Sequence, residues 1–492
     1  MSGEISIISG WWSSADPSHH FDVEEPATGK IIARVQGAGT TEVGEAVVRS
    51  RRAFTSSWRN LLPRERAALM RVAAQRLRDN ADEIATMESR EVGKPYEISR
   101  YSDMFICAEA FDYYAGLADK LHGQFYPGGP IDSYTLLEPY GVVGAIVPFN
   151  WPPIHTGGKI APAIAAGNTV VLKPPEQSPT CVMRIVEILQ DVFPADVVLA
   201  VPGTGASAGN ALVSHPLVRR ISFTGSPETA RHVLRAAAEN FTGALLELGG
   251  KNPLVVFPDA DLDLAVRSAV EGSFFNQGEA CTAASRLLVH ESVLGSFVER
   301  FLALVSRLVV GDPLVPGTHI GPMVTRAHQR RVLDYIALGL EEGATLAYQG
   351  NPPEDPRLSG GFFVPPVVFT EVTPDMRIAQ EEIFGPVAAI MSFSDYEQAV
   401  AIANGTRFAL VAGVFSQDPV LTSRAARDID AGMVFVNNYN RMLFGTPFGG
   451  NRASGYGREH FEQTLHEYVS IKTIRVPSGK APIPAWSGVV LG

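Results

Sequence analysis

Between residues 142 and 250, short β-rich runs alternate with stretches of helical periodicity. Some of these runs, such as residues 169–172 (TVVL), are almost wholly apolar, which is typical of strands buried on both faces of a sheet. Strands that alternate with helices indicate a parallel sheet with helices packed on its faces. The pattern therefore predicts an α/β fold for this part of the chain.

The regions on either side predict further elements. Residues 41–80 and 82–120 have the periodicity of two long amphipathic helices, the second broken near Gly93 and Pro95. After Asp261 a second series of helices and strands continues to about residue 437. The second series predicts a second α/β domain.

Two segments, residues 121–140 and 468–476, fit neither core and have the pattern of extended, partly apolar strands. Such strands would leave exposed edges unless another chain covered them. They therefore predict a homo-oligomer, either a homodimer or a homotetramer.

Composition narrows the functional classes. The 492 residues exceed the size at which one core usually stops growing, which also favours two domains. The 41 Lys and Arg against 52 Asp and Glu give 41 − 52 = −11, so a nucleic acid partner is not expected. The sequence has neither a secretory leader nor an apolar run long enough for a bilayer, which predicts a cytoplasmic protein without a membrane partner. The three cysteines lack zinc spacing, so no metal site is predicted.

Cys281 lies in FFNQGEACTAASR, residues 274–286. Small neighbours predict an accessible thiol at a turn followed by a helix, where backbone N–H groups would favour the thiolate. That environment suits a nucleophile. Cys107 and Cys181 lie in apolar helical patterns and better fit buried structural thiols.

Two polar residues follow apolar strands. Glu247 ends one run and precedes Gly249 and Gly250, so it would act as a general base or face water as an ordinary strand-end glutamate. Asn150 follows another run, where its amide would donate to a developing oxyanion or simply occupy a turn. Ligands of parallel sheets bind at this edge.

A third set suggests a dinucleotide. Lys173 and Glu176 follow a strand and would bind the ribose hydroxyls of an adenosine, and the carboxylate would repel a 2′-phosphate, which favours NAD over NADP. Residues 224–226 precede a helix, whose N-terminus would hold a pyrophosphate. The glycines of residues 203–209 lack the usual dinucleotide spacing.

In this order the motifs resemble the aldehyde dehydrogenase superfamily, in its NAD(P)-dependent hydrolytic type. ELGGKNP and the cysteine motif place 281 − 247 = 34 positions between Glu247 and Cys281. The resemblance continues through three further motifs: EEIFGP (381–386), PFGG (447–450) and SGYGRE (454–459).

The resemblance implies an α/β fold with a Rossmann-like coenzyme domain, an α/β catalytic domain and a β-strand oligomerisation arm. It assigns residues 1–120 and 141–249 to the coenzyme-binding domain and residues 250–447 to the catalytic domain. Residues 121–140 and 448–492 become oligomerisation or bridging segments.

The resemblance also implies roles. Cys281 would be the nucleophile of NAD-dependent aldehyde oxidation, Glu247 the base that hydrolyses the thioester, and Asn150 part of the oxyanion hole. Glu459 would be either a proton relay or a solvated helix glutamate. NAD would be bound by Ile146, Pro148, Phe149, Lys173, Glu176, Gly205, Thr224, Gly225, Ser226, Leu248, Gly249, Glu382 and Phe384.

The substrate residues are expected after Asn150 and in the loop near residue 440: Trp151, His155, Arg441 and Met442. The small Gly158 and neighbouring aromatic residues suggest room for an aromatic or medium-chain aldehyde. Arg441 would instead pair with the carboxylate of a semialdehyde, or lie at a subunit surface.

Three other classes compete with this interpretation. A coenzyme A-acylating dehydrogenase would not need Glu247, and a non-catalytic binding protein would not need the three catalytic residues together. A cysteine hydrolase would need a histidine placed by motif beside Cys281, and the sequence shows none.

Overall fold

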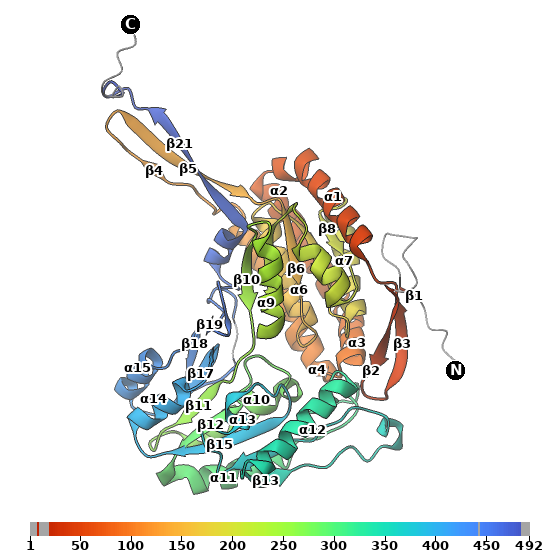
Figure 1. The fold of residues 1–492 in the computed structure, drawn as a ribbon, viewed down its shortest axis with the longest axis vertical. Helices are drawn as coiled ribbons and strands as arrows, with labels where there is room; N and C mark the ends of the chain where they lie inside the picture. Colours follow the sequence, from red (N-terminus) through yellow and green to blue (C-terminus); the bar gives the residue numbers. More distant parts are fainter. Residues whose placement is uncertain (1–6, 9–18, 441–442, 484–492) are drawn as a thin grey trace.

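The computed structural model describes residues 7–8, 19–440 and 443–483. Figure 1 shows two helix-covered sheets, one above the other, with a narrow arm of strands projecting from the upper one. This arrangement confirms the predicted α/β class with a β-strand arm.

The upper sheet has six strands in the order β20-β10-β9-β6-β7-β8, and all neighbours except β20 and β10 are parallel. The chain runs from β6 to β7 and β8 on one side and then crosses to β9 and β10 on the other. Ligands of open α/β sheets bind outside the carboxyl ends of the strands at such a switch point. The strands are β6 (Val142–Ile146), β7 (Thr169–Lys173), β8 (Val198–Ala200), β9 (Val218–Thr224), β10 (Gly243–Glu247) and β20 (Gly455–Tyr456).

The helices of the upper unit pack on both faces of this sheet (Figure 1). Every residue of α6 is buried, because α6 lies between the sheet and α5. The helices that follow the strands are α6 (Pro152–Ala165), α7 (Pro179–Gln190), α8 (Asn210–Val213) and α9 (Pro227–Ala238).

The N-terminal helices correct one prediction. Residues 41–80 form two helices instead of one, because Trp58 is fully buried in a short turn and Pro63 starts a new helix. The predicted break near Gly93 is confirmed, since Gly93 ends α3 in the left-handed conformation at φ +77°. The elements are α1 (Thr40–Ser56), η2 (Trp58–Asn60), α2 (Pro63–Asp79), α3 (Ala81–Val92), α4 (Tyr96–Ile98), η3 (Ser99–Asp103) and α5 (Met104–Leu117).

The lower sheet has seven strands in the order β13-β14-β15-β12-β11-β17-β18. They are β11 (Pro253–Val256), β12 (Arg286–His290), β13 (Thr345–Gln349), β14 (Val367–Thr370), β15 (Val387–Phe393), β17 (Val411–Phe415) and β18 (Met433–Val436). The helices of this unit are α10 (Leu262–Phe274), α11 (Glu291–Val305), α12 (Arg326–Glu341), α13 (Arg377–Gln380), α14 (Tyr396–Asn404) and α15 (Pro419–Asp428). The chain passes from the upper to the lower sheet between Glu247 and Pro253 and returns at β20. The domain limits suggested by the sequence stay a prediction.

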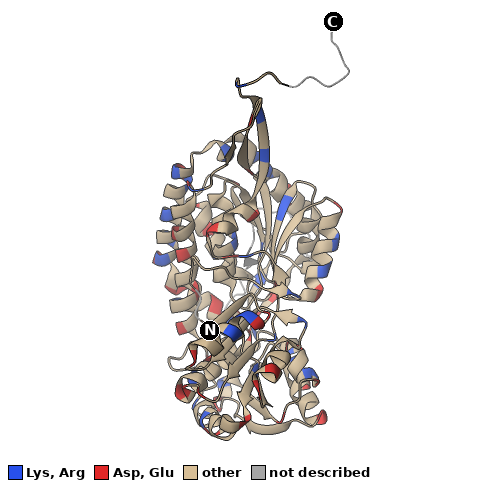
Figure 2. Cartoon of the chain, turned by 90° about the vertical axis from the view of Figure 1, so that its left-hand side faces the viewer, with Lys and Arg blue, Asp and Glu red and all other residues tan. Residues whose placement is uncertain are grey.

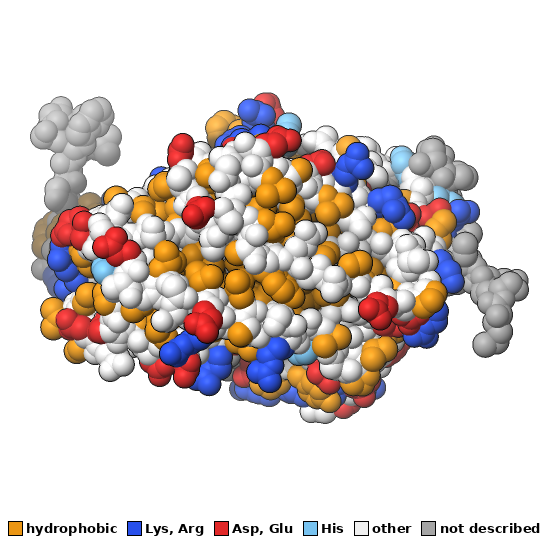
Figure 3. Space-filling model, turned by 90° about the horizontal axis from the view of Figure 1, so that it is seen from below, with side chains coloured by type: hydrophobic (Ala, Val, Ile, Leu, Met, Phe, Trp, Pro, Cys, Tyr) orange, Lys and Arg blue, Asp and Glu red, His pale blue; other side chains and the backbone are white. Residues whose placement is uncertain are grey.

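The arm is a three-stranded antiparallel sheet in which β5 (Ile131–Pro139) pairs with both β21 (Val469–Pro477) and β4 (Phe125–Tyr126). Ile471 and Phe125 on it are exposed. Apolar side chains also gather in the middle of the lower face of the molecule (Figure 3). The predicted homo-oligomer would have these surfaces available for contact.

Short elements complete the described chain: β1 (Ile7–Ile8), β2 (Phe21–Glu25), β3 (Lys30–Val35), η4 (Gly205–Gly209), η5 (Phe275–Gly278), η6 (Pro356–Leu358), β16 (Phe408–Ala409), β19 (Asn451–Arg452) and η7 (Glu462–Tyr468). Figure 2 shows basic and acidic side chains interspersed over one face, without a basic stripe. Among the described residues, no helix is both long enough and apolar enough to cross a bilayer.

Candidate active site

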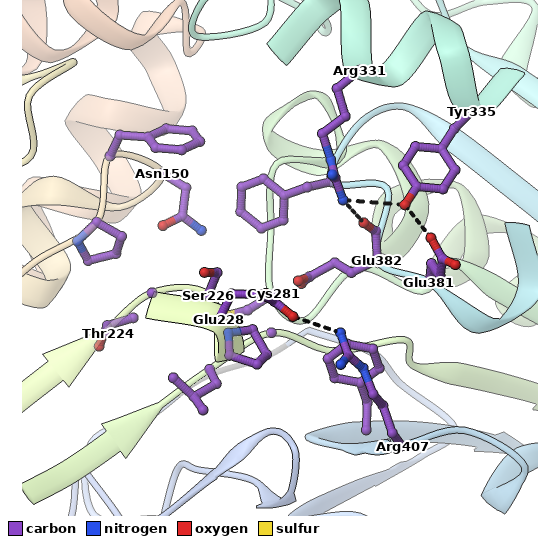
Figure 4. A pocket seen from close by; sticks show the side chains of 18 of the residues that line it. Asn150, Thr224, Ser226, Glu228, Cys281, Arg331, Tyr335, Glu381, Glu382 and Arg407 are labelled. Atoms are coloured by element: carbon purple, nitrogen blue, oxygen red, sulfur yellow. Dashed lines mark hydrogen bonds and ion pairs between the residues drawn. The ribbon is translucent and has the colours of Figure 1, made fainter. Parts of the chain in front are cut away.

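Two cavities of about 790 and 510 Å³ meet at Cys281. Cys281 is the one described residue that lines both. Figure 4 shows the larger cavity, between the carboxyl ends of the upper strands and the lower unit. A group on the Cys281 sulfur is therefore within reach of both cavities.

The Cys281 loop differs from the prediction in one respect. Cys281 and Thr282 form a turn that leads into strand β12, so no helix begins there and no helix N-terminus favours the thiolate. The Asn252 amide donates to the Cys281 carbonyl at 2.8 Å, and the Tyr439 hydroxyl donates to the Thr282 carbonyl at 2.9 Å. These bonds from the lower unit hold the turn in place.

The electrostatic surroundings of Cys281 also differ from the prediction. Burial raises the pKa of the thiol to about 12, and the Glu382 and Glu247 carboxylates add to the shift. Backbone N–H groups of Cys281 and Thr282 favour the thiolate, as predicted, but burial and the negative neighbours outweigh them, so the thiol is protonated at neutral pH. A proton acceptor must therefore take part before the sulfur can attack.

Asn150 follows β6, as predicted, and projects its amide into the larger cavity (Figure 4). The side chain is buried, and the backbone carbonyl accepts a 3.1 Å bond from the Asn276 amide. Asn276 belongs to the loop that carries Cys281, so this bond ties the two segments together.

Glu247 ends β10 and is 2% exposed, which excludes the alternative of a glutamate facing water. Neither of its oxygens has a hydrogen-bond partner among the described residues. Burial, followed by the charge of Glu459, raises the pKa of its carboxyl well above the usual range. Glu247 lines neither cavity, but its charge acts on the Cys281 thiol. Its Oε1 fills the space beside Gly449, where a Cβ would come within 2.5 Å.

Glu459 is buried and lies outside any helix, so the alternative of a solvated helix glutamate is wrong. It forms a 2.8 Å ion pair with Lys159, which also donates to the Ser222 hydroxyl at 3.1 Å. The structure thus places a buried ion pair in electrostatic contact with Glu247. A role as proton relay stays a prediction.

The larger cavity gathers most of the residues predicted to bind a dinucleotide. The Ser226 hydroxyl caps α9, and the buried Thr224 hydroxyl beside it has no hydrogen-bond partner among the described residues. The predicted residues that line the cavity are Pro148, Phe149, Thr224, Gly225, Ser226, Leu248, Gly249, Glu382 and Phe384.

Two adjacent glutamates of this cavity have opposite pKa shifts. Burial raises the pKa of Glu382 to about 7, and its carboxylate accepts a 3.0 Å bond from the Gly250 amide. The Arg377 guanidinium lowers the pKa of Glu381 to about 2. Glu382 is therefore the one of the pair that can gain or lose a proton near neutral pH.

Sequence reasoning missed several side chains of this cavity, among them Arg331, Tyr335 and Arg407. Tyr335 donates to Glu381 at 2.6 Å, and Arg331 donates to the Glu382 carbonyl at 2.9 Å (Figure 4). Arg331 and Tyr335 are four positions apart on α12, so helical spacing was the available signal.

Four predicted coenzyme residues lie outside both cavities, at the ends of the neighbouring strands: Ile146, Lys173, Glu176 and Gly205. Glu176 accepts a 2.6 Å bond from the Gly205 amide and lies 3.8 Å from the Lys173 ammonium. Burial lowers the pKa of Lys173 to about 8. Their position on the same sheet edge as the larger cavity fits an extended ligand.

The smaller cavity is lined by Trp151 and His155, as expected, and by residues that the sequence did not suggest, including Phe275, Phe448 and His460. Arg441 and Met442 lie outside the described residues. Gly158 does not widen the cavity, because a Cβ there would lie 3.1 Å from His460 Nε2. The room predicted at Gly158 is therefore filled by an imidazole.

Comparisons with known proteins agree along nearly the whole chain. The model of the Aldehyde dehydrogenase family matches residues 11–474. The chain is 51% identical to aldehyde dehydrogenase citD of Monascus ruber, over 97% of this chain and 95% of that protein. It is 41% identical to aldehyde dehydrogenase, cytosolic 1, of Mus musculus, over 95% and 94%. The NAD+ complex structure of an aldehyde dehydrogenase from Bacillus cereus superposes with a TM-score of 0.91 at 37% identity, over 93% of each chain.

Proposed function

The chain belongs to the aldehyde dehydrogenase family, and from this premise we propose that it oxidises an aldehyde to the acid through a thioester on Cys281. It is an NAD-dependent aldehyde dehydrogenase. The observation that carries the mechanism is that Cys281 alone joins the two cavities, one on the sheet edge that binds dinucleotides and one mainly apolar.

The larger cavity fits NAD. The N-terminus of α9 and the unpartnered Thr224 hydroxyl supply donors for phosphate oxygens, and Glu382 supplies an acceptor for ribose hydroxyls. Lys173 and Glu176 would hold the adenosine ribose further along the strand ends. When bound, NAD supplies the hydride acceptor of the oxidation.

Cys281 begins the reaction by giving up its thiol proton, for which the Glu382 and Glu247 carboxylates that act on it are the available acceptors, and its sulfur then bonds to the aldehyde carbon. This step leaves negative charge on the aldehyde oxygen. The Asn150 amide, which points into the cavity beside Cys281, would donate to that oxygen. A donor of this kind is worth about 10²–10³ in rate in other enzymes. Oxidation of the adduct leaves an acyl group in thioester linkage to Cys281.

Glu247 would then take a proton from the water that attacks the thioester, which releases the carboxylic acid and the thiol. Its raised pKa makes the Glu247 carboxylate a stronger base than an ordinary glutamate, and its oxygens have no hydrogen bonds within the described chain that would resist a turn towards Cys281. A coenzyme A-acylating enzyme would transfer the acyl group to a second thiol without this base, so Glu247 favours hydrolysis.

We propose an aromatic or medium-chain aldehyde as the substrate. Ile106, Trp151, Ile154 and Phe275 give the smaller cavity an apolar wall. No Lys or Arg is found among its described lining residues, so these supply no cation for the carboxylate of a semialdehyde. The semialdehyde alternative depends on Arg441, which lies outside the described residues.

We also propose a cytoplasmic homo-oligomer, either a homodimer or a homotetramer. The cytoplasmic location is supported by the name of the cytosolic mouse relative. The exposed apolar residues of the arm, such as Ile471, would be covered by a second copy.

A panel of aldehydes with NAD, assayed for NADH by absorbance and for acid by chromatography, tests the proposal. We expect one acid per NADH, with and without coenzyme A, and no NADH from Cys281→Ala. NADH formation by Cys281→Ala at the wild-type rate would contradict the thioester route. Loss confined to carboxylated aldehydes in Arg441→Ala would favour the semialdehyde alternative.

A further inference from the structure

The apolar wall of the smaller cavity is interrupted by two histidine rings, His155 on α6 and His460 after Glu459. Each residue is 4% exposed. Neither ring is used by the mechanism proposed above. A purely apolar substrate would offer neither imidazole ring a hydrogen-bond partner.

Three of the four ring nitrogens lack hydrogen-bond partners among the described residues. Both nitrogens of His155 and Nε2 of His460 are buried and form no hydrogen bond within the part of the chain that the structure describes. Burying a polar group without a partner costs free energy, because the group loses its hydrogen bonds to water. Both rings line the same cavity, so a ligand bound there is the available source of the missing partners.

Both rings are neutral at physiological pH, because burial lowers the pKa of each. A neutral imidazole has one N–H donor and one acceptor nitrogen. The rings thus match a group that can both donate and accept, such as a hydroxyl, or one that accepts, such as a carbonyl oxygen. They do not neutralise a carboxylate.

The surroundings hold His460 in place. Its ring stacks on Phe448 at 5.4 Å between centroids and packs against Phe444 at 5.0 Å. Its carbonyl accepts a 2.8 Å bond from the Gly445 amide. On the other side, Gly158 leaves the space that Nε2 occupies. A ring positioned in this way can discriminate between substrates by geometry.

We propose that the substrate is an aldehyde with an apolar body that carries an uncharged hydroxyl or carbonyl oxygen away from the aldehyde group, bound by His155 and His460. The inference rests on the proposed function, since it places the aldehyde carbon at Cys281. The apolar residues Ile106, Ile154 and Phe275 would contact the body of the molecule. The oxygen would reach the imidazoles at the wall.

Matched substrates test this proposal. Benzaldehydes with a hydroxyl at position 3 or 4 are compared with the corresponding methyl compounds, which are similar in size. A site that binds a hydroxyl discriminates strongly against the analogue without it. We expect kcat/KM to favour one hydroxyl compound by about tenfold or more, chiefly through KM.

Substitutions then locate the effect. His155→Leu and His460→Leu should each reduce the hydroxyl-to-methyl ratio towards one, while His155→Gln, which keeps hydrogen-bonding groups, should retain part of it. Ile154→Val is the control, because it alters the apolar wall and should leave the ratio as in the wild type. Calorimetric titration of the same aldehydes into Cys281→Ala gives a readout independent of turnover, and melting temperatures show that each variant is folded.

An equal ratio in the wild type and in both folded leucine variants would overturn the proposal, as would a preference for 4-carboxybenzaldehyde over both uncharged compounds. Failure of the proposed function gives a different result. In that case the wild type would form no NADH with any aldehyde of the panel, including the methyl compounds.

Discussion

The two cavities that meet at Cys281 differ in the charged and polar side chains that surround them. In the larger one, Glu228 is paired with Arg407, and Glu381 is paired with Arg377 and accepts a hydrogen bond from the Tyr335 hydroxyl. The smaller one has an apolar wall and two neutral imidazoles. One side is built for a ligand with many polar groups, and the other for a molecule with few.

This contrast suggests how one thiol can take part in both the oxidation and the hydrolysis. Paired charges on the coenzyme side can exchange partners with phosphates and hydroxyls without leaving a buried charge alone. In the proposed mechanism the apolar side would keep bulk water from the acyl group, so that hydrolysis would depend on a water deprotonated by Glu247. A substitution on the coenzyme side should therefore affect a different step of the reaction from a substitution on the apolar side.

The largest expected effect comes from Glu247→Gln, which tests whether oxidation and hydrolysis are separate. The amide cannot accept a proton from water, so steady-state kcat should fall by about 10²–10⁴. The first turnover does not need the hydrolytic water, so a burst of NADH should remain in stopped-flow absorbance.

Glu91→Gln is the matched control. Glu91 is also buried, but it accepts bonds from the Thr180 and Cys181 amides at the start of α7 and lines neither cavity. In Glu91→Gln, the ratio of burst amplitude to steady-state kcat should equal that of the wild type. Equal kcat in Glu247→Gln and wild type would remove Glu247 from the hydrolytic step.

The pH dependence gives the next largest effect. The pKa of Glu247 is raised, and only its deprotonated form can accept a proton, so deacylation should increase with pH well above the usual range of a glutamate. Below that pKa the rate should change about tenfold per pH unit. The measurement is kcat against pH, compared with the burst rate, because the thiol pKa of about 12 makes acylation rise with pH as well.

In Glu247→Gln, the rise of kcat with pH that we assign to deacylation should disappear. The rise of the burst rate with pH should persist. If the pH dependence of kcat were the same in Glu247→Gln as in the wild type, a group other than Glu247 would be responsible for it. Glu382, whose pKa of about 7 also results from burial, is the alternative that Glu382→Gln would identify.

Much of this arrangement could be predicted from local sequence. The alternation of apolar runs and helices predicts the parallel sheet, and the residues directly after β6 and β9 then fall on one edge, which brings Asn150 and Ser226 to one cavity. These predictions succeeded because strand direction alone determines where the following residue lies.

Other features depend on packing between distant segments. Trp58, which separates α1 from α2, donates from its indole to the Asn168 carbonyl, a contact that helical periodicity cannot show. His460 reaches the substrate cavity only because its loop packs against α6 at Gly158. Cys281 is partly exposed and lines both cavities, as its small neighbours predicted, but its raised pKa also depends on Glu382 and Glu247, which come from distant segments of the chain.

The smallest expected effect is on the coenzyme side, from Glu176→Ser. The Gly205 amide holds the Glu176 carboxylate near Lys173, where it would repel a 2′-phosphate. Because the side chain is 41% exposed, solvent screening limits the effect. We expect the ratio of kcat/KM for NAD to that for NADP to fall by about tenfold, or ~1.4 kcal/mol.

Glu187→Ser provides the control, because Glu187 is an exposed glutamate of α7 whose partner is Arg184. Its substitution removes one negative charge without touching Lys173, so a general effect of net charge would appear in both variants and a local effect only in Glu176→Ser. A wild type that prefers NADP would contradict the assignment of this carboxylate. A residue at the far strand ends should affect coenzyme binding alone. A change in aldehyde preference in Glu176→Ser would therefore contradict the assignment of separate roles to the two cavities.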